Sequence, residues 1–564
     1  MKKIMPVLIA IVLIIVVAAV GFGAKIAEKY SYSKERADLT EYFGIVGNDD
    51  VPIILQDERI EEHAKLWDNV CYFDFATVHK YFNDRFYEDK KESLLLYTLP
   101  DTIVSVPIGS TSVSVGGNEG SRDYVIARYE GDILYVAADF VKEYANFSYA
   151  LYTEPNHMQI YTEWNDRQVA TITKDTQVRY QGGIKSDILT DVSEGDRVTI
   201  LEPMETWTKV KTTDAFIGYV ENKRLSETFA EIPVPVTDYV EPVYQSNTRD
   251  HKINLAWHQV ASVTGNDTLS EVMSQTKSIN VISPTWFALS DNTGNFTSNA
   301  SQDYVSRAHD MGLEVWGLVD NFTNEGIDTY EILAGTSTRT YLINGLIDAA
   351  LQYGLDGINI DFENISLDAG EPFIEFIREL SIPCRQHGIV LSVDNYVPMG
   401  YTDHYNRKEQ GIVADYVIIM GYDEHYRGSE TAGSVASINF VENGIADTVA
   451  EVPADKVINA IPFYTRIWET KGTTVDSQAV GMALAQQYVS DHGIDISWNE
   501  ETCQNYGEYQ SGDSYYQVWL EDADSIRVKL NIMSKYGIAG VAEWKLGFEV
   551  ASIWDVIEEY MSQP

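Results

Sequence analysis

From about residue 250 to the end of the chain, short apolar runs alternate with segments of helical periodicity. Apolar residues recur at helical spacing in the segments 341–352 and 373–386. Eight apolar runs are predicted as strands, and they begin at Ile253, Ile279, Glu314, Gly357, Ile389, Asp415, Lys456 and Gly540. Eight strands that alternate with helices predict a (β/α)8 TIM barrel over residues 251–564, with its chemistry at the carboxyl ends of the strands.

Before the barrel the pattern changes, because alternating runs of period two dominate. Residues 46–167 combine such runs with a short amphipathic helix at 138–144, which predicts a small α+β domain. Residues 168–229 contain short strands separated by turns and predict a small all-β barrel. The segment 230–250 carries prolines and no helical period, so we expect a linker there.

The N-terminus is predicted to target the chain to a membrane. An uncharged apolar run from Ile4 to Phe22 follows two lysines, and at 1.5 Å per residue it spans about 28 Å, close to the thickness of a bilayer core. We expect residues 1–22 to form a transmembrane signal anchor that holds the chain on the extracellular face. A cleaved signal peptide, which would give a secreted protein, is the alternative. The polar residues 23–45 are predicted to form a stalk.

Composition and charge narrow the range of partners. Hydrophobic residues make up 45% of the chain and aromatic residues 12%, which favours packed cores over disorder. The chain has 85 acidic and 41 basic residues and a net charge of −44, so it would be repelled by nucleic-acid phosphates, and no such partner is expected. Three cysteines without a C-x-x-C pair, and the lack of an H-E-x-x-H motif, predict neither a metal nor another cofactor.

Polar residues concentrate in the fourth predicted strand. Its sequence from residue 356 is DGINIDFE, so Asn359, Asp361 and Glu363 share one face. If that face points into the barrel, two carboxylates and an amide line its axis. Burial and neighbouring like charges raise the pKa of a carboxyl group, which suits a general acid. A solvated edge strand with the same alternation is the alternative.

Three motifs in this region carry a family resemblance. The run Asp356-x-x-Asn359-x-Asp361-x-Glu363 resembles the D-x-x-D-x-D-x-E signature of glycoside hydrolase family 18, the chitinase-like family. Met420-Gly421-Tyr422-Asp423 on the sixth strand is similar to the family's M-x-Y-D motif, and Trp544 ends the eighth strand, where the family has a tryptophan. The resemblance covers about residues 250–564.

The resemblance implies a role for each matched residue. Glu363 would be the general acid that protonates the glycosidic oxygen and then the base that activates water. Asp361 would orient the substrate's 2-acetamido group, whose oxygen attacks the anomeric carbon, and Tyr422 would hydrogen-bond that oxygen, so the product would retain its configuration. The other matched residues would shape the sugar pocket or stack under the ring: Met420, Asp423 and Trp544.

Other residues near the predicted barrel mouth are candidates for sugar binding, because aromatic faces and amides suit sugar rings and hydroxyl groups. They are Asn359, Asn395, Tyr396, Trp286, Tyr464 and Arg466; Trp257, Asn321 and Asp394 occupy similar positions. Core packing or loop structure is the alternative for each of them.

The chain departs from the family pattern at two places. Asn359 stands where the signature has its middle aspartate, so it carries no negative charge and changes the proton balance with Asp361. The third strand reads WGLVDN from residue 316, unlike the family's S-x-G-G, which weakens any specific expectation of chitin. Asparagine at this place is similar to the cell-wall and spore-cortex branch of the family.

The upstream segments carry resemblances of their own. Residues 46–167 resemble the copper amine oxidase N-terminal-like modules of bacterial surface proteins, with no copper implied, and residues 168–229 resemble bacterial SH3-like domains. The expected reaction is hydrolysis of β-1,4 bonds in a glycan that contains N-acetylglucosamine. Together with the anchor and Asn359, the upstream modules favour peptidoglycan or spore cortex over chitin as that glycan. The alternatives are a non-catalytic, lectin-like carbohydrate-binding surface protein and a structural surface protein that uses the barrel as a scaffold.

Overall fold

The computed structural model describes residues 5–234 and 237–563 and divides into two compact units. Unit 2 contains the barrel and every residue from Pro242 onward. It also takes in Tyr87–Ser105 and Ser114–Asn118, which the sequence pattern assigned to an upstream domain. The remaining residues up to 241 belong to unit 1. The barrel unit therefore includes two segments that precede the predicted boundary near residue 250.

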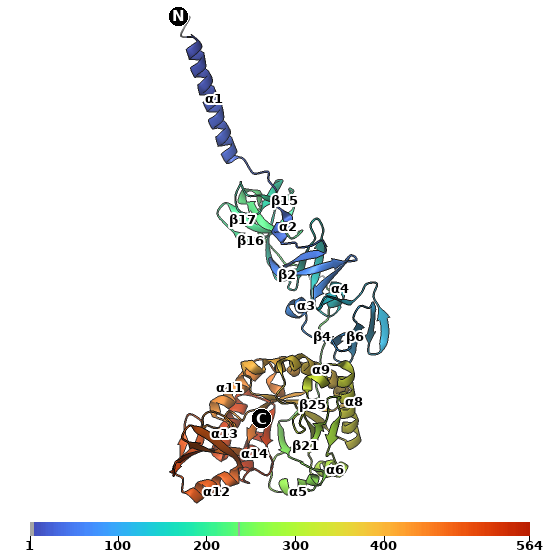
Figure 1. Ribbon diagram of the computed structural model, residues 1–564, viewed down its shortest axis with the longest axis vertical. Coiled ribbons are helices and arrows are strands. Elements are labelled where there is room, and N and C mark those ends of the chain that lie inside the picture. Colours follow the sequence, from blue (N-terminus) through green and yellow to red (C-terminus); the bar gives the residue numbers. More distant parts are fainter. Residues whose placement is uncertain (1–4, 235–236, 564) are drawn as a thin grey trace. The chain divides into compact units, whose positions relative to one another are not determined.

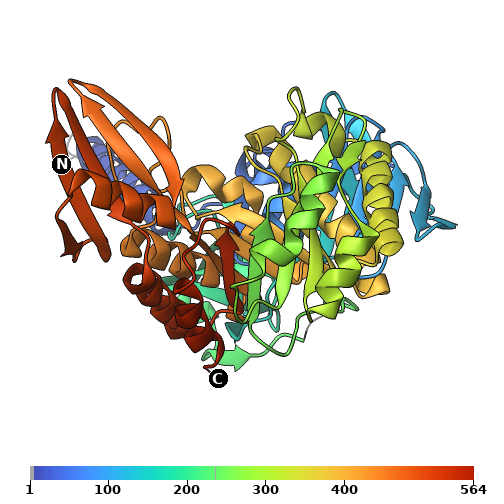
Figure 2. The ribbon, with the colours of Figure 1, turned by 90° about the horizontal axis from the view of Figure 1, so that it is seen from below.

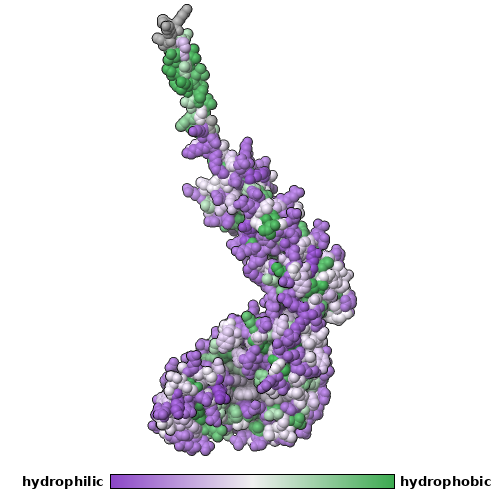
Figure 3. All heavy atoms as spheres, viewed as in Figure 1, coloured by the Kyte–Doolittle hydropathy of each residue, from purple (hydrophilic) through white to green (hydrophobic). Residues whose placement is uncertain are grey.

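The first helix, α1 (Met5–Tyr30), is long and apolar enough to cross a membrane by length and composition, and no part of its most apolar stretch is buried. Figure 3 shows hydrophobic residues along most of its exposed surface. The predicted flank Met1-Lys2-Lys3 and Ile4 lie outside the described residues. The helix continues to Tyr30, well beyond the predicted end at residue 22.

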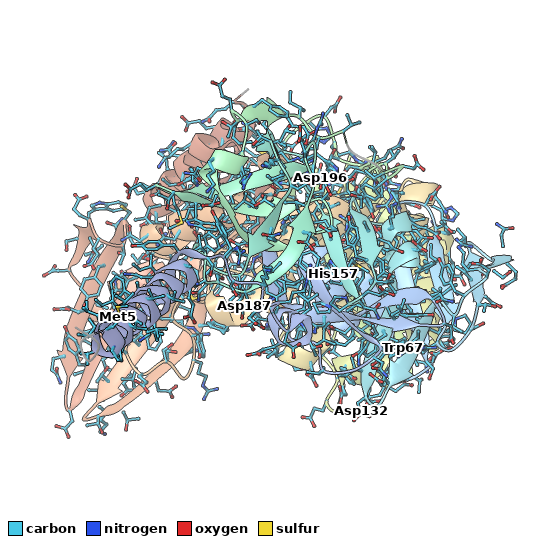
Figure 4. The ribbon with its side chains drawn as sticks, turned by 90° about the horizontal axis from the view of Figure 1, so that it is seen from above. Met5, Trp67, Asp132, His157, Asp187 and Asp196 are labelled. Atoms are coloured by element: carbon cyan, nitrogen blue, oxygen red, sulfur yellow. The ribbon has the colours of Figure 1, made fainter. Side chains whose placement is uncertain are left out.

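Residues 31–45, in the segment predicted as a stalk, contain a short helix with a buried aromatic residue. Helix α2 (Leu39–Phe43) is capped by Asp38, whose carboxylate accepts hydrogen bonds from two backbone N–H groups. Phe43 is only 1% exposed and stacks on the imidazole of His157, with ring centroids 4.4 Å apart. His157 is labelled in Figure 4. Although most residues of this segment are polar, the buried Phe43 ring packs it against the core of unit 1.

Unit 1 contains two seven-stranded sheets. The first has the order β11 (Ser148–Tyr152), β12 (His157–Tyr161), β1 (Asp50–Leu55), β2 (Glu58–Trp67), β3 (Val70–Asp74), β10 (Ile133–Ala137) and β9 (Ala127–Glu130), with helices α3 (Phe75–Tyr81) and α4 (Ala138–Glu143). The second has the order β15 (Ile188–Val192), β14 (Thr176–Arg179), β18 (Ile217–Glu221), β17 (Trp207–Thr212), β16 (Arg197–Pro203), β13 (Arg167–Thr171) and β19 (Phe229–Glu231). Several strands show the predicted period-two alternation, such as β18 with the burial of every second residue, whereas β1 and β12 are buried at consecutive positions.

The predicted eight-stranded parallel barrel is confirmed. Its strands are β20 (Ile253–His258), β21 (Val281–Leu289), β23 (Glu314–Asp320), β24 (Gly357–Asp361), β25 (Val390–Tyr396), β26 (Tyr416–Met420), β27 (Val457–Pro462) and β33 (Gly540–Trp544). Strand β20 pairs in parallel with both β21 and β33, which closes the barrel. A short strand, β22 (Phe296–Ser298), pairs antiparallel with the end of β21.

Aromatic side chains fill the amino-terminal end of the barrel. The Trp316 and Tyr416 rings stack with centroids 5.5 Å apart, and both residues are at most 1% exposed. Gly357 makes room for this packing, because a Cβ atom there would lie 2.6 Å from the Trp316 ring. Above this apolar plug, a cavity lies at the carboxyl ends of the strands, where catalytic residues of TIM barrels lie.

Helices cover the outside of the barrel: α5 (Leu269–Val272), α6 (Gln302–Asp310), α7 (Thr329–Leu333), α8 (Thr336–Tyr353), α9 (Gly370–His387), α10 (Arg407–Val413), α11 (Ile438–Val449), α13 (Ala523–Tyr536) and α14 (Ile553–Met561). Helices α8 and α9 lie side by side (Figure 1), and the Arg339 guanidinium on α8 bonds the Glu379 carboxylate on α9 at 2.7 Å. Both side chains of this ion pair are almost completely buried.

Part of a small sheet from the upstream sequence packs on these outer helices. Its strands are β4 (Phe86–Asp89), β5 (Leu94–Thr98), β6 (Ile103–Pro107), β7 (Ser112–Val115) and β8 (Asn118–Ser121). The Thr98 hydroxyl donates to the Glu375 carboxylate on α9 at 2.6 Å, and Asp89 caps the start of α8 by accepting from the Thr336 N–H at 2.6 Å. These contacts explain why this segment belongs to unit 2.

A second sheet is inserted between the seventh and eighth barrel strands, and the sequence pattern did not predict it. Its order is β29 (Thr474–Gly481), β28 (Tyr464–Lys471), β32 (Ser514–Leu520), β31 (Gln504–Ser511) and β30 (Ile496–Asn499), with helix α12 (Met482–His492). Figure 2 shows this orange-to-red sheet projecting from one side of the barrel. It brings Tyr464, at its first position, to the barrel mouth.

Candidate active site

A cavity of about 300 Å³ lies at the carboxyl ends of the barrel strands. Its wall contains eight of the residues that the sequence proposed for catalysis or sugar binding: Asp361, Glu363, Tyr396, Met420, Tyr422, Asp423, Tyr464 and Trp544. They come from strands β24, β25, β26, β28 and β33 or the residues just after them. Residues far apart in the sequence therefore share one site.

Glu363, two residues beyond the end of β24, is held at the cavity by its backbone and its side chain. Its N–H donates to Asn321 Oδ1 at 2.8 Å, and its carbonyl accepts from Asn321 Nδ2 at 2.9 Å. The Tyr396 hydroxyl donates to Glu363 Oε2 at 2.6 Å. Burial raises the pKa of the Glu363 carboxyl against the lowering effect of Tyr396, and the charges of Asp423 and Asp320 raise it further. Such a carboxyl keeps its proton more readily and suits a general acid.

Asp361 lies at the end of β24, one inward position below Glu363. It is 6% exposed and lines the cavity, and its Oδ1 atom is buried with no hydrogen-bond partner among the described residues. Burial raises its pKa well above the ordinary value, and the charges of Asp394, Glu363 and Asp320 add to the effect. A buried carboxyl without a cation partner is costly to keep, which is typical of functional sites.

Two tyrosines and an aspartate form another part of the cavity wall. The Tyr464 hydroxyl donates to Asp423 Oδ1, and its ring lies edge-on to Tyr422, with centroids 6.2 Å apart. Burial raises the pKa of the Tyr422 hydroxyl well above its ordinary value, with the charge of Tyr464 as the next cause. Tyr422 therefore remains a hydrogen-bond donor across the pH range in which proteins work.

Trp544 and Met420 belong to the apolar part of the cavity wall. Trp544 is partly exposed, and its ring meets the buried Trp257 ring edge to face at 5.8 Å. Met420 is 9% exposed. An aromatic face beside several polar groups is the usual composition of a sugar-binding pocket.

The structure places four of the proposed sugar-binding residues outside the cavity wall. Trp286 faces away from the lumen, and its indole N–H donates to Asn266 Oδ1 at 2.8 Å. Asn395 also faces outward and bonds Gln410 of α10 at 2.7 Å. Strand parity is the reason, because their neighbours Thr285 and Tyr396 take the inward positions. Arg466 bonds Ser477 across the β28–β29 hairpin at 3.2 Å.

Asn359 is the fourth of these residues, and it lies beneath the cavity. It is fully buried, and its amide oxygen accepts from Trp257 Nε1 at 2.9 Å and from Ser283 Oγ at 3.1 Å. Its amide nitrogen donates to Ser392 Oγ at 3.1 Å and to Asp394 Oδ1 at 2.8 Å. All four hydrogen bonds of the amide are used, so it has no donor or acceptor left to offer a ligand in this arrangement.

The cavity wall also contains residues that the sequence did not single out: Gln259, Thr285, Leu318, Asp320, Phe322 and Thr323. Asp320 ends β23, and its carboxylate accepts hydrogen bonds from the Thr323 N–H at 2.8 Å and the Thr323 hydroxyl at 2.9 Å. The sequence could have indicated Asp320 as a site residue, because it is a polar residue at the end of a barrel strand, as Asp361 is. Among residues 5–234 and 237–563, no cluster of His, Cys, Asp and Glu is arranged to hold a metal ion.

Comparison with known proteins identifies the family. The profile of the glycosyl hydrolases family 18 matches residues 256–549, just over half of the chain. The chain belongs to this family. Its barrel is therefore a glycoside hydrolase domain, and the matched residues span the whole cavity wall.

Individual relatives support this assignment. The chain is 25% identical over 296 residues to the uncharacterized glycosylase YvbX of Bacillus subtilis, covering 50% of this chain and 84% of that protein. It is 23% identical over 237 residues to the cortical fragment-lytic enzyme of Bacillus subtilis, covering 40% of this chain and 55% of that enzyme. The chain spans only a little over half the length of several Bacillus relatives.

A solved structure supports the fold. The chitinase of Chromobacterium violaceum aligns over 56% of this chain and its own full length, with a TM-score of 0.50 and 24% sequence identity. At this level of identity the likeness concerns the barrel fold.

Proposed function

We propose that this protein hydrolyses β-1,4 glycosidic bonds next to N-acetylglucosamine by a retaining, substrate-assisted mechanism. One observation carries the proposal: Glu363, Asp361 and Tyr422 reach the same cavity beside the partly exposed face of Trp544. Glycoside hydrolysis needs an acid at the leaving oxygen and a nucleophile at the anomeric carbon. In the proposal the enzyme supplies the acid and the substrate supplies the nucleophile.

In the first step the Glu363 carboxylic acid gives its proton to the glycosidic oxygen. The 2-acetamido oxygen of the sugar forms a bond to the anomeric carbon as the bond to the leaving oxygen breaks. Asp361 accepts a hydrogen bond from the acetamido N–H, and the Tyr422 hydroxyl donates one to the acetamido oxygen. The raised pKa of Glu363 supports the first role, because the acid is protonated before it is needed.

In the second step a water molecule opens the cyclic intermediate. The Glu363 carboxylate takes a proton from this water, whose oxygen attacks the anomeric carbon while the bond to the acetamido oxygen breaks. Two inversions at one carbon give net retention. Tyr396 is placed to steady Glu363 in both steps, because its hydroxyl bonds Oε2 at 2.6 Å.

We propose peptidoglycan, and spore cortex in particular, as the substrate, with chitin-like glycans as the alternative. The cortical fragment-lytic enzyme among the relatives supports the first choice. Helix α1 would anchor the chain in a membrane with its barrel on the extracellular side, where cell-wall glycans lie. The residue ranges 46–167 and 168–229 would then be copper amine oxidase N-terminal-like and SH3-like modules that bind or orient the wall.

The release of reducing ends tests this function. The full chain, purified in detergent, is incubated with cortex peptidoglycan, vegetative peptidoglycan and chitin oligomers. We expect new reducing ends from wild type and from the control Glu500→Gln, an exposed residue of the inserted sheet, and none from Glu363→Gln. Unchanged activity in Glu363→Gln would contradict the mechanism. Glycan binding without product in wild type would favour the lectin-like alternative.

A further inference from the structure

A second fully buried carboxyl group lies beside Asp361, on the neighbouring strand. Strands β24 and β25 are parallel, with Asn359 opposite Ser392 and Ile360 opposite Val393. The same register places Asp361 opposite Asp394, and adjacent strands lie about 4.8 Å apart. Both side chains point inward, and Asp394 is 1% exposed.

Each carboxyl group has one buried oxygen without a hydrogen-bond partner among the described residues. Asp394 Oδ1 accepts from Asn359 Nδ2 at 2.8 Å, while Asp394 Oδ2 is buried with no hydrogen bond among the described residues. Asp361 Oδ1 is buried and unpartnered in the same way. A single proton between these two oxygens would satisfy both. Two buried carboxylates without that proton would repel each other in a medium that solvates neither.

The neighbouring charges with the largest effect on Asp361 are negative. They come from Asp394, Glu363 and Asp320. Burial is the main cause of the raised pKa of Tyr422, and the charges of Asp361 and Asp394 contribute to it. Burial raises the pKa of Asp394 well above its ordinary value, while the hydrogen bond from Asn359 lowers it. The electrostatics thus agree with the geometry.

We infer that Asp394 is a positioning residue that holds a proton and donates it as a hydrogen bond to Asp361, so the pair shares one proton and one negative charge. Asn359 fixes the arrangement, because its amide nitrogen donates to the other Asp394 oxygen. An aspartate at 359 would present an acceptor there instead of a donor. The inference concerns Asp394, which none of the matched motifs contains.

The catalytic consequence rests on the proposed function. Asp361 accepts the acetamido N–H most strongly as a carboxylate. Because Asp394 keeps the shared proton, the negative charge stays on Asp361 when a sugar binds. The pair thereby presents a charged acceptor to the substrate's N–H without a neighbouring cation.

Two substitutions at one position separate this role from a purely structural one. In Asp394→Asn the amide nitrogen replaces the protonated oxygen and still donates to Asp361, so kcat should stay within about threefold of wild type. In Asp394→Ala the donor is lost, and kcat should fall at least about tenfold with KM nearly unchanged. Equal losses in the two variants would overturn the inference, because a residue that acts through its negative charge is not replaced by an amide.

Infrared spectroscopy tests the proton without requiring activity. The full-length wild type at pH 7 should show a protonated-carboxyl stretching band that Asp394→Asn lacks. Glu543→Gln is the matched control, because Glu543 is a fully buried carboxyl with both oxygens unpartnered, outside the cavity wall. The Glu543→Gln variant should lose a carboxyl band other than the one that Asp394→Asn lacks. A spectrum of Asp394→Asn identical to wild type would overturn the inference, and an inactive wild type that shows the band would contradict only the proposed function.

Discussion

Two groups of charged residues are buried in the barrel unit, and they differ in how their charges are matched. Between the outer helices, Arg339 pairs with Glu379 at 2.7 Å, and Arg378 pairs with Glu375 and Glu409 at 3.1 and 2.8 Å. At the carboxyl ends of the strands, Asp361, Asp394 and Glu363 are buried with carboxylates as neighbours. The first group satisfies its charges and holds helices together. The second leaves them unmatched, as expected of a site that binds and moves protons.

The largest expected effect is a loss of kcat when a carboxyl group at the carboxyl ends of the strands is replaced. Glu363→Gln removes the proton donor while keeping the shape of the side chain, so kcat should fall by about 10²- to 10⁴-fold. Its free energy of unfolding should not decrease, because a buried acidic group is replaced by a neutral one. Steady-state kinetics and urea unfolding of the same preparation check both expectations. A parallel fall in stability would show that Glu363 is structural.

The converse effect is expected in the matched group. Arg339→Met leaves Glu379 buried without its partner and should lower the free energy of unfolding by about 3–5 kcal/mol. Activity per folded molecule should remain close to wild type, since both residues lie outside the cavity wall. Denaturant unfolding and active-site titration measure the two quantities. A lower kcat in Arg339→Met that is fully folded would contradict the distinction between the two groups.

A smaller effect is expected beneath the cavity. Asn359→Asp replaces the donor to Asp394 with an acceptor and should cost about 1–3 kcal/mol of stability. The double variant Asn359→Asp, Asp394→Asn restores one donor and one acceptor in exchanged positions, so it should recover most of that loss. A double-mutant cycle gives the coupling energy. Additive effects would show that the two residues do not interact.

The smallest expected effect is the pH dependence of stability. The pKa values of Asp361, Asp394 and Glu363 are raised in the folded state. The folded protein therefore holds more protons than the unfolded chain above the ordinary values of 3.8 and 4.5, and stability contributed by these groups declines as pH rises. Replacing Asp394 by Asn should flatten this decline by up to about 1.4 kcal/mol per pH unit. Urea unfolding at several pH values measures the slope.

The barrel could be predicted from sequence because its eight strands are short apolar runs that stand out from helical segments. The inserted sheet could not, since its strands consist largely of polar residues and their buried positions alternate weakly. Phe43 shows why composition did not reveal the packing of residues 31–45: one buried ring outweighs many polar neighbours. Within the site, the D-x-x-N-x-D-x-E and M-x-Y-D motifs located most of the cavity wall.

Strand parity accounts for the remaining errors at the site. Trp286 and Asn395 lie near the correct strand ends but on the outward side, while Asp394 and Tyr396, on either side of Asn395, point inward. A register shift in the pairing of β21 between Thr285 and Phe287 made the parity of that strand harder to assign. Asn359 was on the inward face, yet its depth below the cavity is a property of packing that no motif records.

The stereochemistry of the first product tests the central claim most directly. Time-resolved proton NMR of the full chain acting on N-acetylglucosamine oligomers reports which anomer appears before mutarotation. The account predicts the β-anomer, because the substrate's acetamido oxygen and then water attack the same carbon in turn. Initial release of the α-anomer would contradict it, since direct attack by water inverts the configuration.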